Sequence, residues 1–541
     1  MENLDPISFE ILKNSLISIA EEMGVVLRKS SFSPNIKERR DYSCALFNAS
    51  GQLVAQAEHI PVHLGAMPYS VQAVLKEFKD DLAEGDDTIL NDPYRGGTHL
   101  PDITMVSPIF FKENLVGFAA NRAHHSDVGG VAPGSMSALS RDVNQEGIRI
   151  PPVKLWARGK PNRQILDFVL SNVRTPDERL GDLRAQRAAN LVGAKRLRDL
   201  LKKSSVSTVE TGMAQLIDYS EELMIRKIRE LPRKSSSAVD YLDDDGFGTT
   251  DIPIRVKVTI DRQSIAFDFS ASAKQVQGPL NAMYSVTLSA VYYVVRCVTD
   301  PSIPANAGCF KPIQAIAPSG TIVNAEPPAA VAGGNVETST RIVDVTLKAL
   351  SRITPERVCA ACQGTMNNVT IGGIDPLTGR YFTYYETIAG GFGARHTKDG
   401  VDGIHSHMTN TLNTPVEALE SAFPLRIKKY ELVRGSGGRG KFRGGLGIRR
   451  DTVVLAERST ISLMGERQRH GPWGLSGGVS GSPGAYGIVQ GNRISRLSSK
   501  TTLTANPGDV LTVRTPGGGG YGAPSLRMRE KMGQDRADDK A

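Results

Sequence analysis

The sequence predicts a mixed α+β fold with a large α/β N-terminal half and a β-rich, barrel- or sandwich-like C-terminal part. Three observations predict it. Apolar residues recur every three or four positions near the N-terminus and over 176–230, which is typical of amphipathic helices. Apolar and polar residues alternate in several paired segments, as they do in hairpins. After residue 430, short apolar runs are separated by glycine-rich stretches.

The elements of the N-terminal half follow from these patterns. Asp5 is a helix cap and Pro6 suits the first turn of a helix. The buried face of that helix would carry Phe9, Leu12, Leu16, Ile19, Met23 and Val26. Residues 41–57 indicate a hairpin, and a short helix is expected over about 66–80.

The second half begins after a long helical region. Thr175-Pro176-Asp177 is a start signal for helices over 176–230, and 232–240 has the composition of a linker. A hairpin is expected over 252–270, with helices over 284–298 and 337–353. We expect a metal-binding α/β region at 1–175, a helical segment at 176–231, a central α/β domain at 240–425, a Gly-rich β domain at 426–524 and a flexible tail at 525–541.

Composition excludes several classes of protein. The chain has 541 residues, of which 40% are hydrophobic and 23% charged, so a sizeable core is expected rather than disorder. The net charge is +8, but the basic residues are dispersed, so no nucleic-acid partner is expected. Five cysteines fit a reducing cytoplasm. The N-terminus lacks the pattern of a secretory signal, and the most apolar run, residues 290–295, is too short to cross a membrane.

The strongest chemical signal is a pair of apolar segments, 103–111 and 115–123, joined by a three-residue polar turn. This predicts an antiparallel hairpin centred on residue 113. Residues equally far from the centre then face each other, which pairs Asp102 with His124 at about 5 Å between Cβ atoms. His99 precedes Asp102 by three residues in a Gly/Pro loop. Together these three residues predict a metal site.

Two His and a carboxylate suit Zn, Mn or Fe without selecting one of them. Asp41 is a candidate fourth ligand at the start of a strand, and His125 and Asp127 are candidate hydrogen-bond partners of the ligands. The alternative is that these are polar residues at strand ends that bond the backbone. The set as a whole favours the metal site.

Two glycine-rich motifs are weak signals. Residues 435–442 nearly match a phosphate-binding loop, but Phe442 stands where a hydroxyl must meet Mg²⁺. Residues 474–478 match G-x-S-x-G without the strand and helix of a nucleophile elbow. Neither ATP binding at this loop nor serine hydrolysis is expected.

The chain resembles the hydantoinase B / 5-oxoprolinase family, the B-type subunit of ATP-dependent hydantoinases, oxoprolinases and lactamases. It is also similar to subunits of acetone and acetophenone carboxylases. The resemblance covers about 4–525. The motifs that carry it lie at 38–43, 59–65, 91–102, 123–127, 172–176, 334–339, 409–417 and 442–447.

The resemblance implies a metal site at Asp41, His99, Asp102 and His124, and a partner: an A-type subunit that binds ATP-Mg, in a hetero-oligomer such as (AB)2. The expected reaction is ATP-dependent opening of a cyclic amide, namely a hydantoin, 5-oxoproline or a lactam. Phosphorylation on the partner would activate the carbonyl, and a water made acidic at the metal would attack it. His59, His63 and His125 are candidate proton carriers, although His59 and His63 would equally serve as loop residues that bond the backbone.

Two other functions stay open. One is an ATP-dependent carboxylase of the acetone or acetophenone type, which would require bicarbonate. The other is a non-catalytic scaffold subunit, which would keep activity after His99→Ala.

Overall fold

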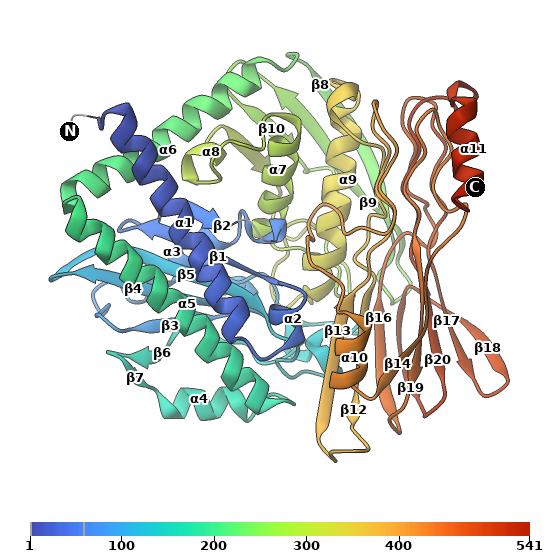
Figure 1. The fold of residues 1–541 in the computed structure, drawn as a ribbon, viewed down its shortest axis with the longest axis horizontal. Coiled ribbons are helices and arrows are strands. Elements are labelled where there is room, and N and C mark those ends of the chain that lie inside the picture. Colours follow the sequence, from blue (N-terminus) through green and yellow to red (C-terminus); the bar gives the residue numbers. More distant parts are fainter. Residues whose placement is uncertain (1–2, 58–59, 541) are drawn as a thin grey trace.

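The computed structural model describes residues 3–57 and 60–540. It confirms a mixed α+β protein, built from four sheets and the helices packed on them (Figure 1). In Figure 1 the N-terminal half lies on the left and the β-rich C-terminal part on the right. Within the described ranges none of the four sheets closes into a barrel.

The N-terminal half is organised around an antiparallel seven-stranded sheet with the order β2-β1-β5-β4-β3-β6-β7. Its strands are β1 (Tyr42–Asn48), β2 (Leu53–Ala57), β3 (Asp87–Leu90), β4 (Asp102–Phe111), β5 (Asn114–His124), β6 (Val153–Ala157) and β7 (Lys160–Pro161). The predicted hairpin at 41–57 is β1–β2, and the predicted hairpin centred on residue 113 is β4–β5. β4 and β5 lie in the middle of the sheet, so both are almost wholly buried.

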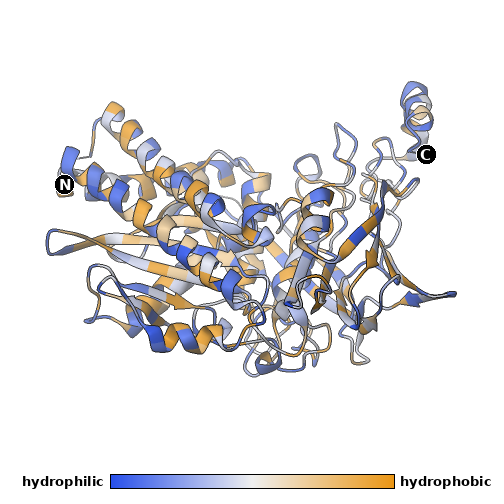
Figure 2. Ribbon diagram, turned by 60° about the horizontal axis from the view of Figure 1, so that its bottom comes forward, coloured by the Kyte–Doolittle hydropathy of each residue, from blue (hydrophilic) through white to orange (hydrophobic). Residues whose placement is uncertain are grey.

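Helices cover this sheet on both sides. The helices are α1 (Pro6–Ser30), α2 (Pro34–Lys37), α3 (Met67–Glu77), α4 (Arg163–Leu170), α5 (Pro176–Lys203) and α6 (Val206–Arg229). Asp5 caps α1 by accepting from Ile7 and Ser8, as predicted. The predicted apolar face of α1 is buried except for the half-buried Val26, and Figure 2 shows polar and apolar residues alternating along these helices.

The central region is a four-stranded sheet, β11-β10-β9-β8, packed against two helices. Its elements are β8 (Ser235–Asp244), β9 (Thr250–Ile260), β10 (Ile265–Asp268), α7 (Tyr284–Val298), α8 (Ala307–Phe310), β11 (Ile313–Ile316) and α9 (Ser339–Leu350). The expected hairpin and helices are confirmed. The expected linker at 232–240 is wrong from Ser235 onward, because β8 pairs with β9 there and buries Ala238, Asp240 and Leu242 in alternation.

The C-terminal part is a sandwich of two sheets, β13-β12-β16-β19 and β14-β15-β20-β17-β18. Its strands are β12 (Asn368–Ile374), β13 (Tyr381–Thr387), β14 (Leu425–Leu432), β15 (Ile448–Val454), β16 (Ser459–Met464), β17 (Ala485–Gln490), β18 (Arg493–Leu497), β19 (Lys500–Ala505) and β20 (Val510–Arg514), and α10 (Val416–Ala422) precedes β14. One apolar cluster contains residues from both layers, including Ile371, Leu463 and Leu511. Of the two expected forms, the sandwich is confirmed.

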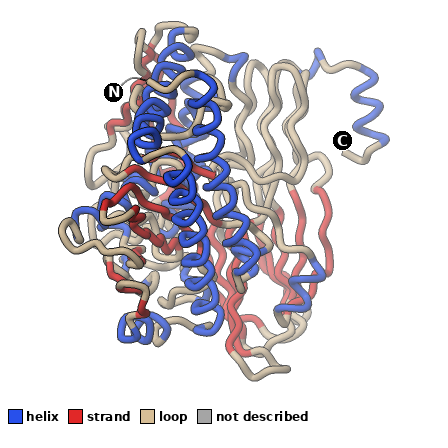
Figure 3. The backbone as a smooth tube through the Cα atoms, turned by 60° about the vertical axis from the view of Figure 1, so that its left-hand side comes forward, coloured by secondary structure: helices blue, strands red, loops and turns tan. Residues whose placement is uncertain are grey.

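The glycine-rich connections are not simple turns. Residues 388–404, 433–447, 465–484 and 515–523 run as extended segments beside one another, visible as neighbouring tan tubes above the sandwich strands in Figure 3. Backbone bonds join them: Gly445 N donates to Phe392 O at 2.8 Å, and Gly518 N donates to Gly445 O at 2.9 Å. A Cβ at Gly518 would lie 2.2 Å from the carbonyl oxygen of Phe392. Glycine is therefore required here by close packing of backbones.

The tail contains a short helix, α11 (Arg529–Ala537), none of whose residues is buried. In the described part of the chain, no helix combines the length and the apolar character needed to span a bilayer.

Candidate metal centre

The hairpin β4–β5 places two of the predicted ligands opposite each other. β4 begins at Asp102 and β5 ends at His124, and the strand register pairs these two residues directly, as predicted. A register shift after Ile109 stays near the turn and leaves the open end unchanged. His99 joins them because a tight turn, in which Asp102 N donates to His99 O at 3.1 Å, folds the preceding loop back onto the strand.

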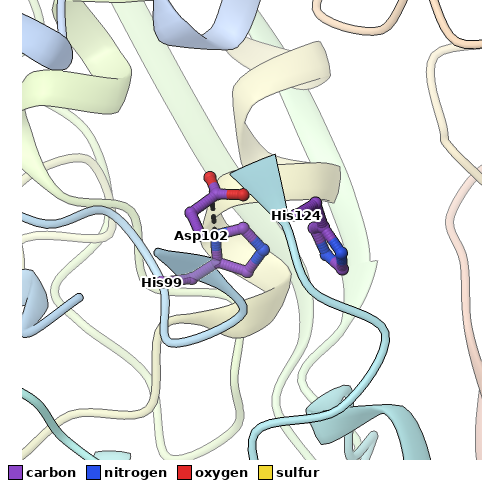
Figure 4. A group of neighbouring side chains, drawn as sticks. All are labelled: His99, Asp102 and His124. Atoms are coloured by element: carbon purple, nitrogen blue, oxygen red, sulfur yellow. Dashed lines mark ion pairs between the residues drawn. The ribbon is translucent and has the colours of Figure 1, made fainter. Parts of the chain in front are cut away.

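The three side chains form one group of donor atoms. One ligand atom each from His99, Asp102 and His124 lies within 4.8 Å of the others. Asp102 Oδ2 is 3.1 Å from His99 Nδ1, and Figure 4 marks this ion pair with His124 beside it on the adjacent strand. All three are buried, at 0%, 1% and 3% exposure. This is a candidate three-residue metal site.

The unpaired atoms of the group fit a cation. His99 Nε2, His124 Nε2 and Asp102 Oδ1 are buried and find no hydrogen-bond partner among the described residues. Buried polar atoms are normally paired, because leaving one unpaired costs about 1–3 kcal/mol. Two imidazoles and a carboxylate are donors that Zn, Mn and Fe accept. The donor set therefore fits a divalent ion and does not select among these three.

The charges of the group also suit a cation. Burial by itself would raise the pKa of Asp102, but the adjacent His99 and His63 hold that pKa well below its usual value, so the carboxylate stays ionised. Burial, together with His99, lowers the pKa of His124 well below its usual value, so its imidazole stays neutral. An ionised carboxylate and a neutral imidazole are the forms that coordinate metals.

Asp41, the predicted fourth ligand, lines a small cavity that Asp102 and His124 also line. It is not in the group of mutually close donor atoms; its Oδ2 lies 3.6 Å from the guanidinium of Arg39. Burial raises the pKa of Asp41, while Arg39 opposes that rise and Asp102 adds to it. Its backbone carbonyl accepts from His124 N at 3.0 Å, so Asp41 is tied to the ligand strand through the main chain.

The three predicted proton carriers occupy different places. His63 reaches the group, with Nε2 3.5 Å from Asp102 Oδ2 and Nδ1 2.9 Å from Ser43 Oγ. His125 contacts α5 instead, with Nε2 3.0 Å from Gln186 Oε1. Burial, followed by the charge of Arg179, lowers the pKa of His125 to about 4. His59 lies outside the described residues.

Gln186 explains how His125 is held. Its Nε2 donates to Ile103 O and Asn121 Oδ1, both at 2.9 Å, so its Oε1 is left to accept from His125 Nε2. His125 Nδ1 is then an unpaired acceptor among the described residues.

The predicted role of Asp127 as a partner of the ligands stays a prediction; its carboxylate accepts from Arg174 at 2.9 Å and from nearby backbone N–H groups.

Sequence reasoning missed the residues that enclose the group. Tyr385 of β13 stacks on the His124 ring, with centroids 4.6 Å apart and an interplanar angle of 11°. Thr98 donates to Asp102 Oδ2 at 3.0 Å, and Asn35 lies 3.4 Å from His124 Nδ1. The cavity beside the group measures about 20 Å³ and is also lined by Asn335, Val336, Met366, Thr387, Met408 and Thr409. Thr98 lies in the ligand loop itself, and Asn335, Val336 and Thr409 lie in the segments 334–339 and 409–417 that carry the family resemblance.

Fold and donor set together define a large mixed α/β protein with a buried candidate metal centre at the end of a central hairpin. The sequence profile of the Hydantoinase B/oxoprolinase family matches residues 5–524, so the chain belongs to this family. The resemblance seen in the sequence is thereby confirmed.

Curated relatives extend over nearly the whole chain. An uncharacterized protein of Methanocaldococcus jannaschii is 45% identical over 99% of this chain and 94% of its own length. The protein named 5-oxoprolinase 1 of Arabidopsis thaliana is 38% identical over 96% of this chain, but the match spans only 42% of the plant protein. A putative B-type subunit of a D-/L-hydantoinase from a Pseudomonas strain is 32% identical over 99% of this chain and 93% of that protein.

Two solved structures share the fold. The ATP-dependent caprolactamase of Pseudomonas jessenii superposes with a TM-score of 0.93 and 29% identity, covering 100% of this chain and 95% of that one. A nucleotide-free acetone carboxylase superposes with a TM-score of 0.92 over 99% of this chain and 78% of that one. Its identity of 21% shows a common fold alone.

Proposed function

We propose that this chain is the metal-dependent subunit of an ATP-dependent cyclic amidohydrolase. It would open a hydantoin, 5-oxoproline or lactam ring together with an A-type ATP-binding subunit, in a hetero-oligomer such as (AB)2. The observation that carries the proposal is the buried group of His99, Asp102 and His124, whose donor atoms lie within 4.8 Å of one another. Support for the substrate class comes from relatives that are named 5-oxoprolinase, hydantoinase and caprolactamase, all after cyclic amides.

Each residue of the group has a proposed role. His99, Asp102 and His124 would hold one divalent ion, Zn, Mn or Fe, with Asp41 as a fourth ligand. The bound ion would supply Lewis-acid chemistry, polarising an amide carbonyl and making water more acidic. Thr98 keeps Asp102 oriented through its 3.0 Å hydrogen bond.

Proton transfer is proposed for His63. Its Nε2 faces the carboxylate of Asp102 at 3.5 Å, while its Nδ1 is held by Ser43, so one ring nitrogen is anchored and the other faces the site. His125 is buried and its pKa is lowered to about 4, so it would act from its neutral form; its predicted role stays a prediction, as does that of His59.

The size of the cavity implies movement. A cavity of about 20 Å³ holds about one water molecule, not a five-membered ring. We infer that the walls part for the substrate, and that docking of the ATP-binding subunit would open them. ATP-Mg would bind that partner, because the glycine-rich loop at 435–442 packs among other backbone segments, with Gly438 N donating to Gly518 O at 2.8 Å.

The hydrolase is preferred to the carboxylase for one reason. The likeness to the acetone carboxylase, at 21% identity, extends only to the fold, whereas the likeness to the caprolactamase also reaches 29% identity. The cytoplasmic location inferred from the cysteine count stays a prediction.

Metal content tests the proposal. The chain is purified without chelator, and elemental analysis is made of the unsubstituted chain, His99→Ala, Asp102→Ala and, as a matched control, the exposed His396→Ala. We expect about one Zn, Mn or Fe per chain in the unsubstituted chain and in His396→Ala, and loss in the other two.

Activity is then measured with the ATP-binding partner. We expect ring opening of a cyclic amide that depends on ATP, needs no bicarbonate, and is abolished by His99→Ala while the complex still assembles. A folded, metal-free wild-type chain would contradict the metal role, and activity retained by His99→Ala would favour the scaffold.

A further inference from the structure

A basic groove lies where the N-terminal half meets the C-terminal part. It measures about 400 Å³, within the usual range for small-molecule sites of roughly 300–1,000 Å³. Its walls come from the end of α1, from α2 with the residues that follow it, and from the segment 412–415 that precedes α10. In Figure 1, α2 and α10 lie close together at this boundary.

Four cations line the groove without a bound counter-charge. They are Arg28, Lys29, Lys37 and Arg40, and among the described residues none of them makes an ion pair or a side-chain hydrogen bond. Glu38 is the one acidic residue that the described chain contributes to the lining, so four cations stand against one carboxylate, a net charge of +3. Like charges gathered around one hollow repel one another, and a bound anion would relieve that repulsion.

The groove is accessible from solvent. Lys29, Lys37 and Arg40 are exposed, and Arg28 is half-buried. The segment from the C-terminal part adds an apolar surface, since Leu412 is 48% exposed and Pro415 is exposed too. A ligand with both an anionic group and an apolar body therefore fits the lining better than a bare ion does.

Arg40 connects the groove to the metal centre along the chain. Arg40 lines the groove, whereas the next residue, Asp41, lines the small cavity beside the metal centre. The backbone of Arg40 has a left-handed φ of 58°. Residues other than glycine adopt this conformation rarely, and such strain gathers at functional sites.

Asn413 makes a second connection, through side chains. It lines the groove, and its Nδ2 donates at 2.7 Å to the backbone oxygen of Thr387, a residue that lines the small cavity. Thr387 Oγ1 accepts from Arg39 at 2.9 Å, and Arg39 O accepts from Leu412 N at 3.0 Å. The groove and the small cavity are thus back to back, separated by Arg39 and Thr387.

We propose that this groove binds a small organic phosphate and is the place where the phosphorylated cyclic amide docks before it enters the metal centre. The four cations would bind the phosphate group, and Leu412 and Pro415 would contact the ring. The inference rests on the function proposed above, because it takes the substrate to arrive phosphorylated from the ATP-binding partner. It adds a location and a set of binding residues outside the metal centre.

Calorimetric titration of the full chain tests the binding site. Phenyl phosphate is the probe, because it joins a phosphate to an apolar ring. Phenol, which keeps the ring and lacks the phosphate, and inorganic phosphate, which lacks the ring, are the control ligands. The titration is repeated in His99→Ala, where the metal centre is disabled, and at higher salt, which screens exposed charges.

Two double variants with the same loss of charge give the decisive comparison. The groove variant is Lys37→Gln/Arg40→Gln. The control variant is Lys112→Gln/Arg458→Gln, which removes two exposed cations outside the groove, both at left-handed positions like Arg40. We expect one phenyl phosphate per chain, bound at least about tenfold more weakly by the groove variant and with unchanged affinity by the control variant and by His99→Ala. Binding should weaken at higher salt, inorganic phosphate should bind more weakly than the probe, and phenol should not bind.

The complex with the ATP-binding partner tests the role of the groove in the reaction. The groove variant should keep the metal content of the control variant and still assemble with the partner. It should hydrolyse more ATP per ring opened, because phosphorylated substrate that is not captured is lost to water. A metal-free chain that still binds phenyl phosphate in the groove would refute the proposed metal role and leave the binding site standing.

Other results overturn the inference. Absence of phenyl phosphate binding to the unsubstituted chain, or equal weakening in the two double variants, would remove the binding site. Loss of binding in His99→Ala would assign the probe to the metal centre, and equal or tighter binding of inorganic phosphate would remove the role of the apolar wall. An unchanged ratio of ATP to ring opening would refute docking of the substrate, and loss of assembly with phosphate binding intact would assign the groove to the partner. If the groove variant does not fold, Lys29→Gln/Lys37→Gln must show the same weakening.

Discussion

Tyr385 contributes to the metal centre through its ring. One face stacks on His124 with centroids 4.6 Å apart, and the guanidinium of Arg39 lies 4.9 Å from its ring centroid. Its hydroxyl donates to Asn368 Oδ1 at 2.8 Å, which fixes the plane of the ring. The orientation of His124, and with it the direction of Nε2, is therefore set by a residue from another sheet.

We predict that Tyr385→Ala weakens metal binding about 10–100-fold, as loss of a group that orients a ligand typically does. Tyr385→Phe keeps the stacking face and loses only the hydroxyl, so its metal affinity should stay within a few-fold of the unsubstituted chain. Competition titration against a chromophoric chelator measures both. Equal affinities for all three proteins would mean that stacking does not orient His124.

Glu146 predicts a dependence of stability on pH. Burial, partly offset by hydrogen bonds from Ala332 N and Val331 N, raises its pKa from 4.5 to about 8. Because the folded-state pKa lies above the unfolded one, the folded state holds a proton that the unfolded state releases. This group therefore disfavours folding progressively as pH rises from about 4.5 to about 8.

Glu146→Gln keeps an acceptor for both N–H groups and cannot ionise. We expect the variant to be more stable than the unsubstituted chain at pH 8 and to lose less stability between pH 5 and pH 8, measured as the urea midpoint in steps of pH. A residual slope is expected, because burial also raises the pKa of Glu337 to about 8 and that of Glu466 to about 7. An unchanged slope of stability against pH would show that Glu146 does not contribute to the pH dependence.

At the scale of elements, local patterns predicted the ligand hairpin well. A short turn fixes the register of an antiparallel pair, so Asp102 and His124 were placed opposite each other from the position of the turn alone, and the structure confirms the pairing. Tyr385 and Asn335 could not be placed in this way. They reach the site across more than 200 residues of chain, and no local spacing encodes contacts between elements that far apart.

In the glycine-rich region, local reasoning predicts the wrong role for many glycines. Glycine signals a turn because it adopts backbone conformations closed to other residues. Here many glycines serve close packing, as at Gly391, where a Cβ would lie 2.1 Å from Gly445 O and 2.2 Å from Gly518 N. The strands between these segments were predicted, but the layer that the segments form with one another was not.

Gly518→Ala tests this layer. The added Cβ would lie 2.2 Å from Phe392 O, and backbone, unlike a side chain, cannot rotate out of the way. We expect a loss of stability of about 1–3 kcal/mol, seen as a lower urea midpoint. Gly533→Ala in α11 is the matched control, since nothing lies within 4 Å of its Cβ position. Equal midpoints for the two variants would refute the packing argument.

At the scale of the molecule, the metal centre joins the two halves. Asp102 and His124 come from the N-terminal sheet and Asp41 directly precedes its strand β1, whereas Tyr385 comes from β13 of the sandwich. Met366 and Met408 come from the segments that precede β12 and α10. Arg39 makes the same connection, donating to Thr387 Oγ1 at 2.9 Å. A cation held at this boundary would stabilise both halves, because the walls that bury it belong to both.

Metal removal should therefore destabilise both halves of the molecule. A ligand that binds only the folded state adds about 2.7 kcal/mol of stability at 100 times its Kd. We expect treatment with EDTA to lower the melting temperature, and Zn, Mn or Fe to restore it, in the unsubstituted chain but not in His99→Ala. Hydrogen exchange should rise after EDTA both at the Asp102 end of β4 and around Tyr385 in β13. Faster exchange confined to β4 would show that the cation stabilises the N-terminal half alone. Unchanged exchange in both strands would show that the metal centre does not contribute to the stability of the fold.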